Sequence, residues 1–293
     1  MPDRLPDQTA DGTSRRLTDR ATDPITHPAT HPATHPKGAA PEARPAAYGR
    51  GRRMLKAVGY GLLFAAPVTF LAFVVQQKVT PVLDIDEAAI AEATEVTRTN
   101  EVLRELLVMW QEATQPKWVY IAGTLVCLWI WRRHHLKTRA LWAFVTMMVA
   151  WNLQLVLKEV VRRARPIVSD PIEQAPGYSF PSGHAANAAA AATILTLLVW
   201  PVLSERAKPW VTGAAVAFAL ITGLDRVFLG VHYPSDVTAG LLLGVGLGIA
   251  SYVGYLGWNP ASQDAPLPPE GTAGPEPHSL NPQPPEESDD DER

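Results

Sequence analysis

The sequence is poor in cysteine: Cys127 is the only one, and it lies inside an apolar run. A single thiol cannot build an intramolecular disulfide framework or a cysteine-based metal site, so the sequence excludes both. The formal net charge is only -3, and no basic stretch is interleaved with aromatic residues. A nucleic acid is therefore not an expected partner.

Long apolar runs are missing from residues 1–53 and 259–293, which are rich in proline, charge and small polar residues. We expect both tails to be disordered, and the second, which ends in PPEESDDDER, to be acidic and solvated. His27, His31 and His35 stand four residues apart and could indicate a metal site. Each precedes a proline, which blocks the helix that would align them, so an unstructured repeat is the favoured interpretation.

The middle of the chain is dominated by apolar stretches, the first of which begins only after residue 53. That position is too deep for a cleavable secretion signal, so we expect this stretch to remain as a membrane anchor. About 20 apolar residues cross a bilayer as a helix. Six stretches are candidates: 54–77, 118–131, 141–161, 184–203, 210–229 and 236–258. The sequence therefore predicts an all-α fold, a six-transmembrane helix bundle over residues 54–258, with a short second span.

Basic residues that flank membrane helices favour the cytoplasmic side. They cluster before the first stretch, after the second and after the fourth: Arg50, Arg52, Arg53, Lys56, Arg132, Arg133, Lys137, Arg139, Arg206 and Lys208. This pattern predicts a multi-pass protein of the cell membrane with both termini in the cytoplasm. Residues 79–116, 162–183 and 230–235 then lie on the extracytoplasmic side.

An amphipathic helix is predicted within residues 79–116, resting on the membrane or on the bundle, because apolar residues recur there at spacings of three and four. They are Leu103, Leu106, Leu107 and Trp110. Asp84, Asp86 and Glu87 could be metal ligands, but no second ligand cluster accompanies them. The favoured interpretation is that these carboxylates stabilise the start of the helix through its dipole.

Small residues recur at every fourth position of the last apolar stretch, at Gly240, Gly244 and Gly248. Such a stripe lets two membrane helices approach closely, so we expect it to serve packing and assign it no chemistry.

Three charged segments interrupt the predicted extracytoplasmic side: KEVVRRARP at 158–166, FPSGH at 180–184 and DRVFLGVHYPSD at 225–236. Each lies where an apolar stretch meets the interface. Charged groups at membrane depth are unfavourable unless they are paired or functional, so three such segments at one level predict a shared polar site. Ordinary interfacial snorkelling is the alternative for KEVVRRARP taken alone.

In the first segment, Lys158 and Arg165 are seven residues apart and would share one helical face. Arg162 would lie on the same face, whereas Arg163 would point elsewhere. Pro166 is expected to end this helix.

The second segment places Ser182, Gly183 and His184 at the start of an alanine-rich helix. The free N–H groups and the positive dipole of a helix start suit a phosphate, a hydroxyl adds a donor, and a glycine allows close approach. The alternative is that Ser182 only caps the helix and His184 is an interfacial residue.

The third segment places Asp236 four residues after His232, just inside a helix that Pro234 can begin. A carboxylate that binds one imidazole nitrogen fixes the tautomer and leaves the other nitrogen free as a nucleophile. An interfacial histidine with a capping aspartate is the alternative, but Arg226 would still need a partner.

Together the three segments resemble the type 2 phosphatidic acid phosphatase superfamily. Its pattern is lysine, six residues and Arg-Pro; then Pro-Ser-Gly-His; then Ser-Arg, five residues, histidine, three residues and aspartate. Here the pattern is carried by Lys158, Arg165, Pro166, Pro181, Ser182, Gly183, His184, Arg226, His232 and Asp236. One position departs, because Asp225 stands where the family has serine. An ionised carboxylate cannot donate to phosphate, so we expect it to orient Arg226 or a neighbour.

The resemblance implies an integral membrane lipid phosphatase that uses no metal and no other cofactor. His232 would attack phosphorus to form a phosphohistidine, Asp236 would orient and polarise it, and His184 would protonate the leaving oxygen and then activate water. The phosphoryl oxygens would be held by Lys158, Arg165, Ser182, Gly183 and Arg226. The expected partners are membrane lipids and a lipid phosphate substrate: phosphatidate, phosphatidylglycerol phosphate or a polyprenyl diphosphate. The oligomeric state stays open.

Two other functions fit parts of the pattern. A lipid-phosphate transporter or binding protein would use the same cations without cleavage, but it would not need His232 and Asp236 beside His184. A soluble-type vanadate haloperoxidase, which the resemblance also allows, shares the anion pocket, but six membrane stretches disfavour it.

Overall fold

A computed structural model describes residues 46–168, 172–173 and 175–258 of the chain. The predictions of an acidic disordered tail and of a histidine repeat fall on residues 259–293 and 1–45, outside the described residues. The first helix begins at Ala46, earlier than the boundary predicted after residue 53.

The described residues form helices joined by turns and loops, with no strand among them. The elements are α1 (Ala46–Gln76), α2 (Thr80–Thr99), α3 (Glu101–Ala113), α4 (Pro116–His134), α5 (Lys137–Val161), α6 (Gly183–Val199), η1 (Trp200–Val202), α7 (Ala207–Phe228) and α8 (Pro234–Trp258). The prediction of an all-helical fold is therefore confirmed for this part of the chain.

Five of the six predicted spans are helices long and apolar enough to cross a membrane: Gly51–Gln76, Lys137–Val161, Gly183–Val202, Ala207–Phe228 and Pro234–Leu256. The remaining predicted span, 118–131, corresponds to α4, which does not meet this description. Lys117 lies in the first turn of α4 and Arg132 and Arg133 in its last turn, so its uncharged stretch is short.

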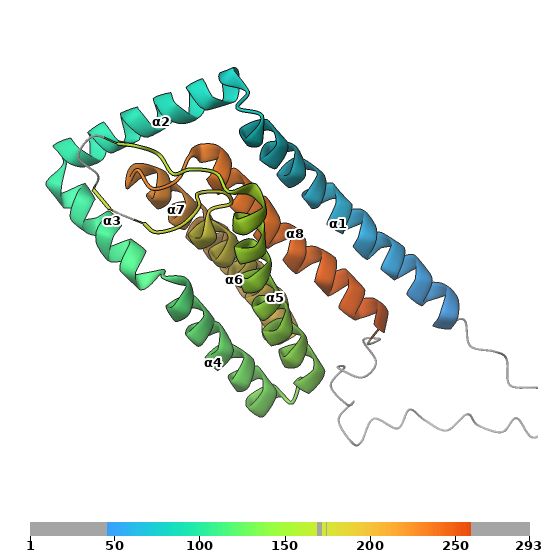
Figure 1. The fold of residues 1–293 in the computed structure, drawn as a ribbon. Coiled ribbons are helices and arrows are strands. Elements are labelled where there is room, and N and C mark those ends of the chain that lie inside the picture. The colour runs from blue at the N-terminus through green and yellow to red at the C-terminus, as the bar shows by residue number, and fades with distance from the viewer. Residues whose placement is uncertain (1–45, 169–171, 174, 259–293) are drawn as a thin grey trace, which may run out of the picture. The chain divides into compact units, whose positions relative to one another are not determined.

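Helix α6 lies at the centre of the bundle and packs against α4, α5, α7 and α8, while α1 packs along α8 (Figure 1). Alanine makes this position possible, because a helix without bulky side chains lets several neighbours approach it. The buried alanines of α6 are Ala185, Ala186, Ala188, Ala189, Ala190 and Ala191.

The segment 79–116, predicted to contain one amphipathic helix, forms two. Asn100 separates α2 from α3 and caps α3, because its side-chain oxygen accepts a hydrogen bond from the backbone N–H of Leu103 at 2.9 Å. Trp110 of α3 donates to the Thr222 hydroxyl of α7 at 3.2 Å, so α3 rests on the bundle. Figure 1 shows α2 lying across one end of the bundle. We call α2 and α3 together the elbow.

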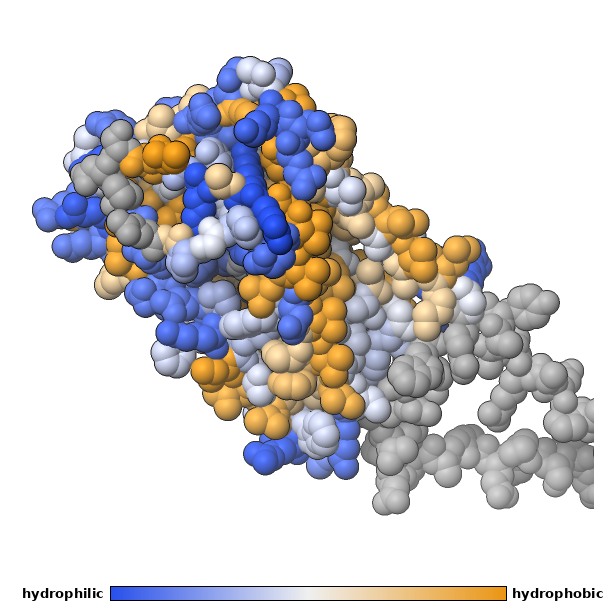
Figure 2. Space-filling model, viewed as in Figure 1, coloured by the Kyte–Doolittle hydropathy of each residue, from blue (hydrophilic) through white to orange (hydrophobic). Residues whose placement is uncertain are grey.

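Hydrophilic residues gather at the elbow end and again at the opposite end, with hydrophobic residues along the helices between them (Figure 2). Gln76 near the end of α1 donates to the carbonyl of Val160 near the end of α5 at 3.4 Å, so these two helix ends meet. Ser182 at the start of α6 donates its N–H to the carbonyl of Asp236 in α8 at 3.0 Å. The helix ends that carry the three charged segments therefore share one end of the bundle.

One predicted helix boundary is wrong. Helix α5 ends at Val161, ahead of Pro166, because Arg162 takes a left-handed conformation with a φ of 50°. The Arg162 side chain is exposed and donates to the carbonyl of Glu159 at 2.9 Å. Lys158 and Arg165 therefore do not share a helical face; Arg165 lies in the loop after α5.

The glycine stripe of α8 packs against α6, as its spacing predicted. A Cβ atom on Gly240 would lie 2.7 Å from the carbonyl oxygen of Ser182. One on Gly244 would collide with the carbonyl oxygen of Ala186 and lie 2.6 Å from the backbone nitrogen of Ala190. The two helix backbones are therefore in direct contact, which fixes the start of α6 relative to that of α8.

We expect Gly244→Ala to destabilise the protein by about 1–3 kcal/mol, because the added methyl meets backbone that cannot move without separating α6 from α8. The measurement is the thermal unfolding midpoint of the detergent-solubilised protein. Gly213→Ala is the matched control, since a Cβ there meets nothing within 4 Å. Equal midpoints for the two variants would contradict the packing described.

Candidate functional site

A polar cavity of about 410 Å³ opens at the elbow end of the bundle, where α5 ends and α6 begins. Five of the eight predicted site residues line it: Lys158, Arg165, Gly183, His184 and His232. The sequence did not single out its other lining residues, which are Gln115, Pro116, Lys117, Trp151, Gln154, Leu155 and Asn187. Ser182, Arg226 and Asp236 are not among the lining residues, and all three are buried.

His232 lies in the turn between α7 and α8 and is only 3% exposed. Its Nε2 atom is 3.2 Å from Nη1 of Arg165. Because a guanidinium group can only donate, Nε2 must accept this bond, and the imidazole proton must sit on Nδ1. This tautomer puts the lone pair of Nε2 on the side of the cavity that Arg165 lines.

Asp236, in the first turn of α8, holds the other side of the His232 ring. Its Oδ2 atom is 3.7 Å from Nδ1, too far for a direct hydrogen bond. The hydroxyl of Ser179 lies between them, donating to Oδ2 at 2.5 Å and standing 3.3 Å from Nδ1. Ser179 was not predicted from the sequence, because a serine in a loop carries no spacing signal.

Two further expectations concern Asp236 indirectly and are corrected. Arg163 does not point away from the site: it is buried and donates to Oδ1 of Asp236 at 2.7 Å. Asp86 does not act at the start of α2: it lies within that helix, buried, and pairs with Nη2 of Arg163 at 2.8 Å. The first error follows from the early end of α5, which turns Arg163 inward, and the second from the start of α2 at Thr80, which leaves no acidic residue in its first turn.

The start of α6 presents the groups that a phosphate needs. Ser182 occupies the position before the helix, but its side chain makes no capping hydrogen bond, so the capping alternative is wrong. Within the described residues, neither the Ser182 hydroxyl nor Nε2 of His184 has a hydrogen-bond partner, and both atoms are buried. A Cβ atom on Gly183 would lie 3.1 Å from Oε1 of Gln154 and 3.6 Å from Cε of Lys158, so glycine keeps this wall open.

Lys158 and Arg165 shape the cavity through the loop that follows α5. Lys158 donates to the carbonyl of Tyr178 at 2.7 Å. Arg165 donates to the carbonyls of Gly177, Pro176 and Val231 at 3.0, 3.0 and 2.8 Å. These bonds fix both cations at the cavity wall without neutralising them, because carbonyl groups carry no net charge.

Arg226 is buried, and its guanidinium group is held by neighbouring side chains. It donates to Oδ2 of Asp225 at 2.8 Å, in line with the expectation that Asp225 orients it, and to Oε1 of Gln111 at 2.6 Å. Gln111 belongs to α3 and was missed, since its role depends on how the elbow folds back onto α7. Asp225 therefore partly offsets the charge of a predicted phosphate-binding residue.

No metal centre is apparent in the described part of the chain, where no three His, Cys, Asp or Glu side chains are grouped to hold an ion. The carboxylate of Asp86, once considered with Asp84 and Glu87 as a ligand, is occupied by an arginine.

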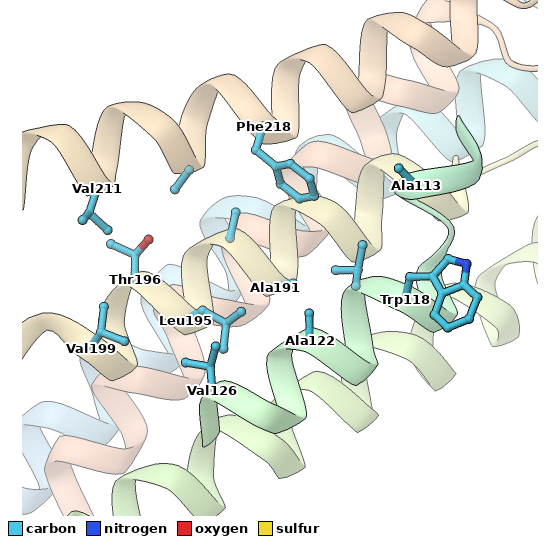
Figure 3. Close-up of a pocket in the computed structure, with 13 residues that line it drawn as sticks. Ala113, Trp118, Ala122, Val126, Ala191, Leu195, Thr196, Val199, Val211 and Phe218 are labelled. Atoms are coloured by element: carbon cyan, nitrogen blue, oxygen red, sulfur yellow. The ribbon is translucent and has the colours of Figure 1, made fainter. Parts of the chain in front are cut away.

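A second cavity, of about 450 Å³, lies next to the polar one and is apolar. Figure 3 shows its side chains pointing toward one another from α4, α6 and α7. Along α6 it begins with Ala191, one turn after Asn187 of the polar cavity, and along α4 with Trp118, directly after Lys117. We call it the apolar groove.

The sequence of residues 139–259 matches the family model described as PAP2 superfamily. The resemblance drawn from the three motifs is thereby confirmed, and all eight predicted site residues lie inside the matched range. The elbow lies outside it.

Among PAP2 relatives, phosphatidylglycerophosphatase B of Bacillus subtilis is 35% identical over 114 residues, covering 36% of this chain and 55% of that protein. Decaprenylphosphoryl-5-phosphoribose phosphatase of Mycobacterium tuberculosis is 36% identical over 105 residues, covering 34% and 52%. The chain thus spans about half the length of these curated relatives. The crystal structure of a transmembrane PAP2 type phosphatidylglycerolphosphate phosphatase from Bacillus subtilis superposes with a TM-score of 0.58 at 25% identity, covering 67% of this chain and 94% of that one.

The pKa of His232 is lowered to about 4, chiefly by burial and also by Lys158 and Arg165, while the Asp236 carboxylate opposes the shift. We therefore expect the ring to stay neutral down to about pH 4. The ordinary pKa of histidine is about 6.5, so the unfolded chain takes up this proton first, and folding stability should fall as the pH drops from about 6.5 to 4.

The measurement is a pH titration of ¹⁵N-histidine signals in the detergent-solubilised protein, with His232→Gln identifying the resonance. A midpoint near the ordinary histidine value would contradict the burial and charge environment described for this ring.

Proposed function

We propose that this protein is an integral membrane lipid phosphatase that cleaves a phosphate monoester or diphosphate of a lipid through a phosphohistidine. The observation that carries the proposal is the polar cavity, where a neutral His232, the His184 ring and two cations meet at the start of a helix. Binding alone would need the cations and the helix start, but not a nucleophile paired with a second imidazole.

In the first step, Nε2 of His232 attacks phosphorus, the N–P bond forms, and the bond from phosphorus to the leaving oxygen breaks. His184 gives that oxygen a proton. Asp236 and Ser179 keep the proton of His232 on Nδ1, so Nε2 carries the lone pair and attacks once Arg165 turns its N–H from Nε2 to a phosphoryl oxygen. The transferring oxygens are held by Lys158, Arg165, Ser182, Arg226 and the backbone N–H of Gly183, because phosphoryl transfer depends on positioning and on stabilising negative charge.

In the second step, His184 removes a proton from water. The water oxygen bonds to phosphorus, the N–P bond breaks, and inorganic phosphate leaves. The residues named supply every proton and charge that this cycle needs, so the proposed reaction uses no metal.

We propose that residues 54–258 form the membrane domain and that α4 crosses the membrane as a sixth span. Packing of α4 against α5 and α6 supports this, as does its direction, from the polar cavity at Lys117 to Arg132 and Arg133 at the other end. Basic residues at that other end favour a cytoplasmic location for it and for both termini. The cavity would then face the extracytoplasmic side.

The substrate class we propose is an amphiphile whose phosphate enters the polar cavity while a hydrocarbon chain lies in the apolar groove. The adjacency of the two cavities along α4 and α6 supports this. The names of the relatives, which include a phosphatidylglycerophosphatase and an undecaprenyl-diphosphatase, support both phosphatidylglycerol phosphate and polyprenyl diphosphates as candidates.

We expect the detergent-solubilised protein to release inorganic phosphate from phosphatidate, phosphatidylglycerol phosphate or a polyprenyl diphosphate with EDTA present. His232→Ala should lower the rate by about a thousand-fold or more and His184→Ala by about a hundred-fold or more, because they remove the nucleophile and the acid. Phosphate release measured across the panel tests both expectations.

Equal release by wild type and both variants would sink the enzyme assignment. Tight binding of a lipid phosphate without release would favour the transport or binding alternative instead, and loss of activity with EDTA would contradict a metal-free mechanism.

We expect Ala122→Trp to slow hydrolysis of a long-chain substrate by about ten-fold relative to a short-chain one with the same headgroup, because the indole fills the groove but not the polar cavity. The ratio of kcat/KM for the two substrates is the measurement. Ala214→Trp is the matched control: Ala214 is exposed on α7 and does not line the groove. An unchanged ratio in Ala122→Trp would contradict the placement of the chain.

A further inference from the structure

The Arg163 side chain is fixed by groups from three parts of the fold. Nη1 donates to Oδ1 of Asp236 and to the hydroxyl of Ser235, both at 2.7 Å, and Nη2 donates to Oδ2 of Asp86 at 2.8 Å. The guanidinium also lies over the Tyr233 ring, 4.1 Å from its centroid. The side chain is 7% exposed. Arg163 therefore has little freedom to move while these partners stay in place.

Asp86 is the part of this arrangement that comes from the elbow. It is 1% exposed, and both of its oxygens are used. Oδ1 accepts from the backbone N–H of Ser235 at 3.0 Å, and Oδ2 accepts from Arg163 and from the Ser235 hydroxyl. One carboxylate of α2 is thus joined both to Arg163 and to the first turn of α8, which carries Asp236.

The two oxygens of Asp236 have separate partners as a result. Oδ1 faces Arg163, and Oδ2 faces Ser179, the backbone N–H of Tyr233 and the Nδ1 side of His232. If Arg163 shifted, Oδ1 would lose its donor and the carboxylate could rotate away from the imidazole. A buried arginine that loses one of two carboxylates is left partly uncompensated and will move toward other acceptors.

We propose that Asp86 is a positioning residue for the reaction: through Arg163 it holds Asp236 in the orientation that keeps His232 ready for attack. This rests on the function proposed above. It adds a functional residue from outside residues 139–259, the range that matches the family.

Loss of Asp86 should affect turnover but not phosphate binding. The interactions of Asp86 are with Arg163 and Ser235, and neither of these lines the polar cavity. Its loss should therefore disturb the nucleophile while leaving the phosphate-binding groups Lys158 and Gly183 in place.

The test is Asp86→Asn, which keeps the size of the side chain and removes its charge. We expect kcat to fall by about ten- to a hundred-fold while KM stays within about three-fold. Asp84→Asn is the matched control on the same helix, because Asp84 is exposed, and it should behave as wild type. A wild-type kcat for Asp86→Asn, or an equal loss in Asp84→Asn, would overturn the proposal.

A double-mutant cycle with Arg163→Gln tests whether Asp86 affects kcat through Arg163. If Asp86 acts through Arg163, adding Asp86→Asn to Arg163→Gln should lower kcat by less than about three-fold. A ten- to a hundred-fold further loss of kcat would show that Asp86 does not act through Arg163.

If thermal unfolding shows that Asp86→Asn does not fold, Asp86→Glu replaces it. This variant keeps the charge, but its longer side chain displaces Arg163, so kcat should fall with KM unchanged. A wild-type kcat would overturn the proposal.

A readout without turnover separates this proposal from the proposed function. The ¹⁵N signals of His232 should report a proton on Nδ1 in wild type, and the Nδ1 signal should shift in Asp86→Asn as Asp236 turns away from that nitrogen. If wild type cleaves none of the lipid phosphates, the proposed function fails, and a shifted Nδ1 signal in the variant would still support the link from Asp86 to His232. Unchanged His232 signals in Asp86→Asn would overturn the link itself.

Discussion

Arg163 is a charge buried where little water reaches, and its desolvation is offset by the groups packed around it: Asp86, Asp236, Ser235 and the Tyr233 ring. Burial alone would lower the pKa of Arg163, but the two carboxylates outweigh it and raise the pKa above its ordinary value. The group therefore stays charged, and the elbow, the loop after α5 and the start of α8 must stay together around it. The geometry of His232 depends on this cluster through Asp236.

A second constraint brings these residues and the proposed phosphate-binding groups together. Helices α6 and α8 meet backbone to backbone because glycines of α8 face the alanines of α6. That contact places the N–H groups at the start of α6 beside the first turn of α8, where Asp236 accepts the Ser182 N–H on its backbone carbonyl. Small side chains in the membrane part therefore set the spacing of polar groups at its end.

The sequence predicted most of the helices because their apolar stretches are long, and proline or glycine begins α4, α6 and α8. It also predicted that α8 starts at Pro234 and that α6 starts near His184. It did not predict that α5 ends at Val161, since a left-handed Arg162 is not encoded by any local signal. That single error displaced Arg163 from the predicted site.

Contacts between distant segments escaped prediction for a different reason. Spacing can show that His232 and Asp236 are near each other, because they are four residues apart. It cannot show that Ser179 lies between them, or that Asp86 and Gln111 of the elbow reach Arg163 and Arg226, because those contacts exist only after the chain has folded back on itself. Residues with no pattern of their own thus complete a site whose outline the motifs predict.

The elbow precedes residues 139–259 in the chain, so moving that range into another protein would not carry the elbow with it. A chimera that grafts residues 139–259 onto another protein's amino-terminal half would carry Arg163, Arg226 and every motif residue but leave Asp86 and Gln111 behind. Both arginines would then rely on whatever the host offers at those two places. The part of this protein that matches the family is therefore not a self-contained module, because two of its buried arginines depend on the amino-terminal helices.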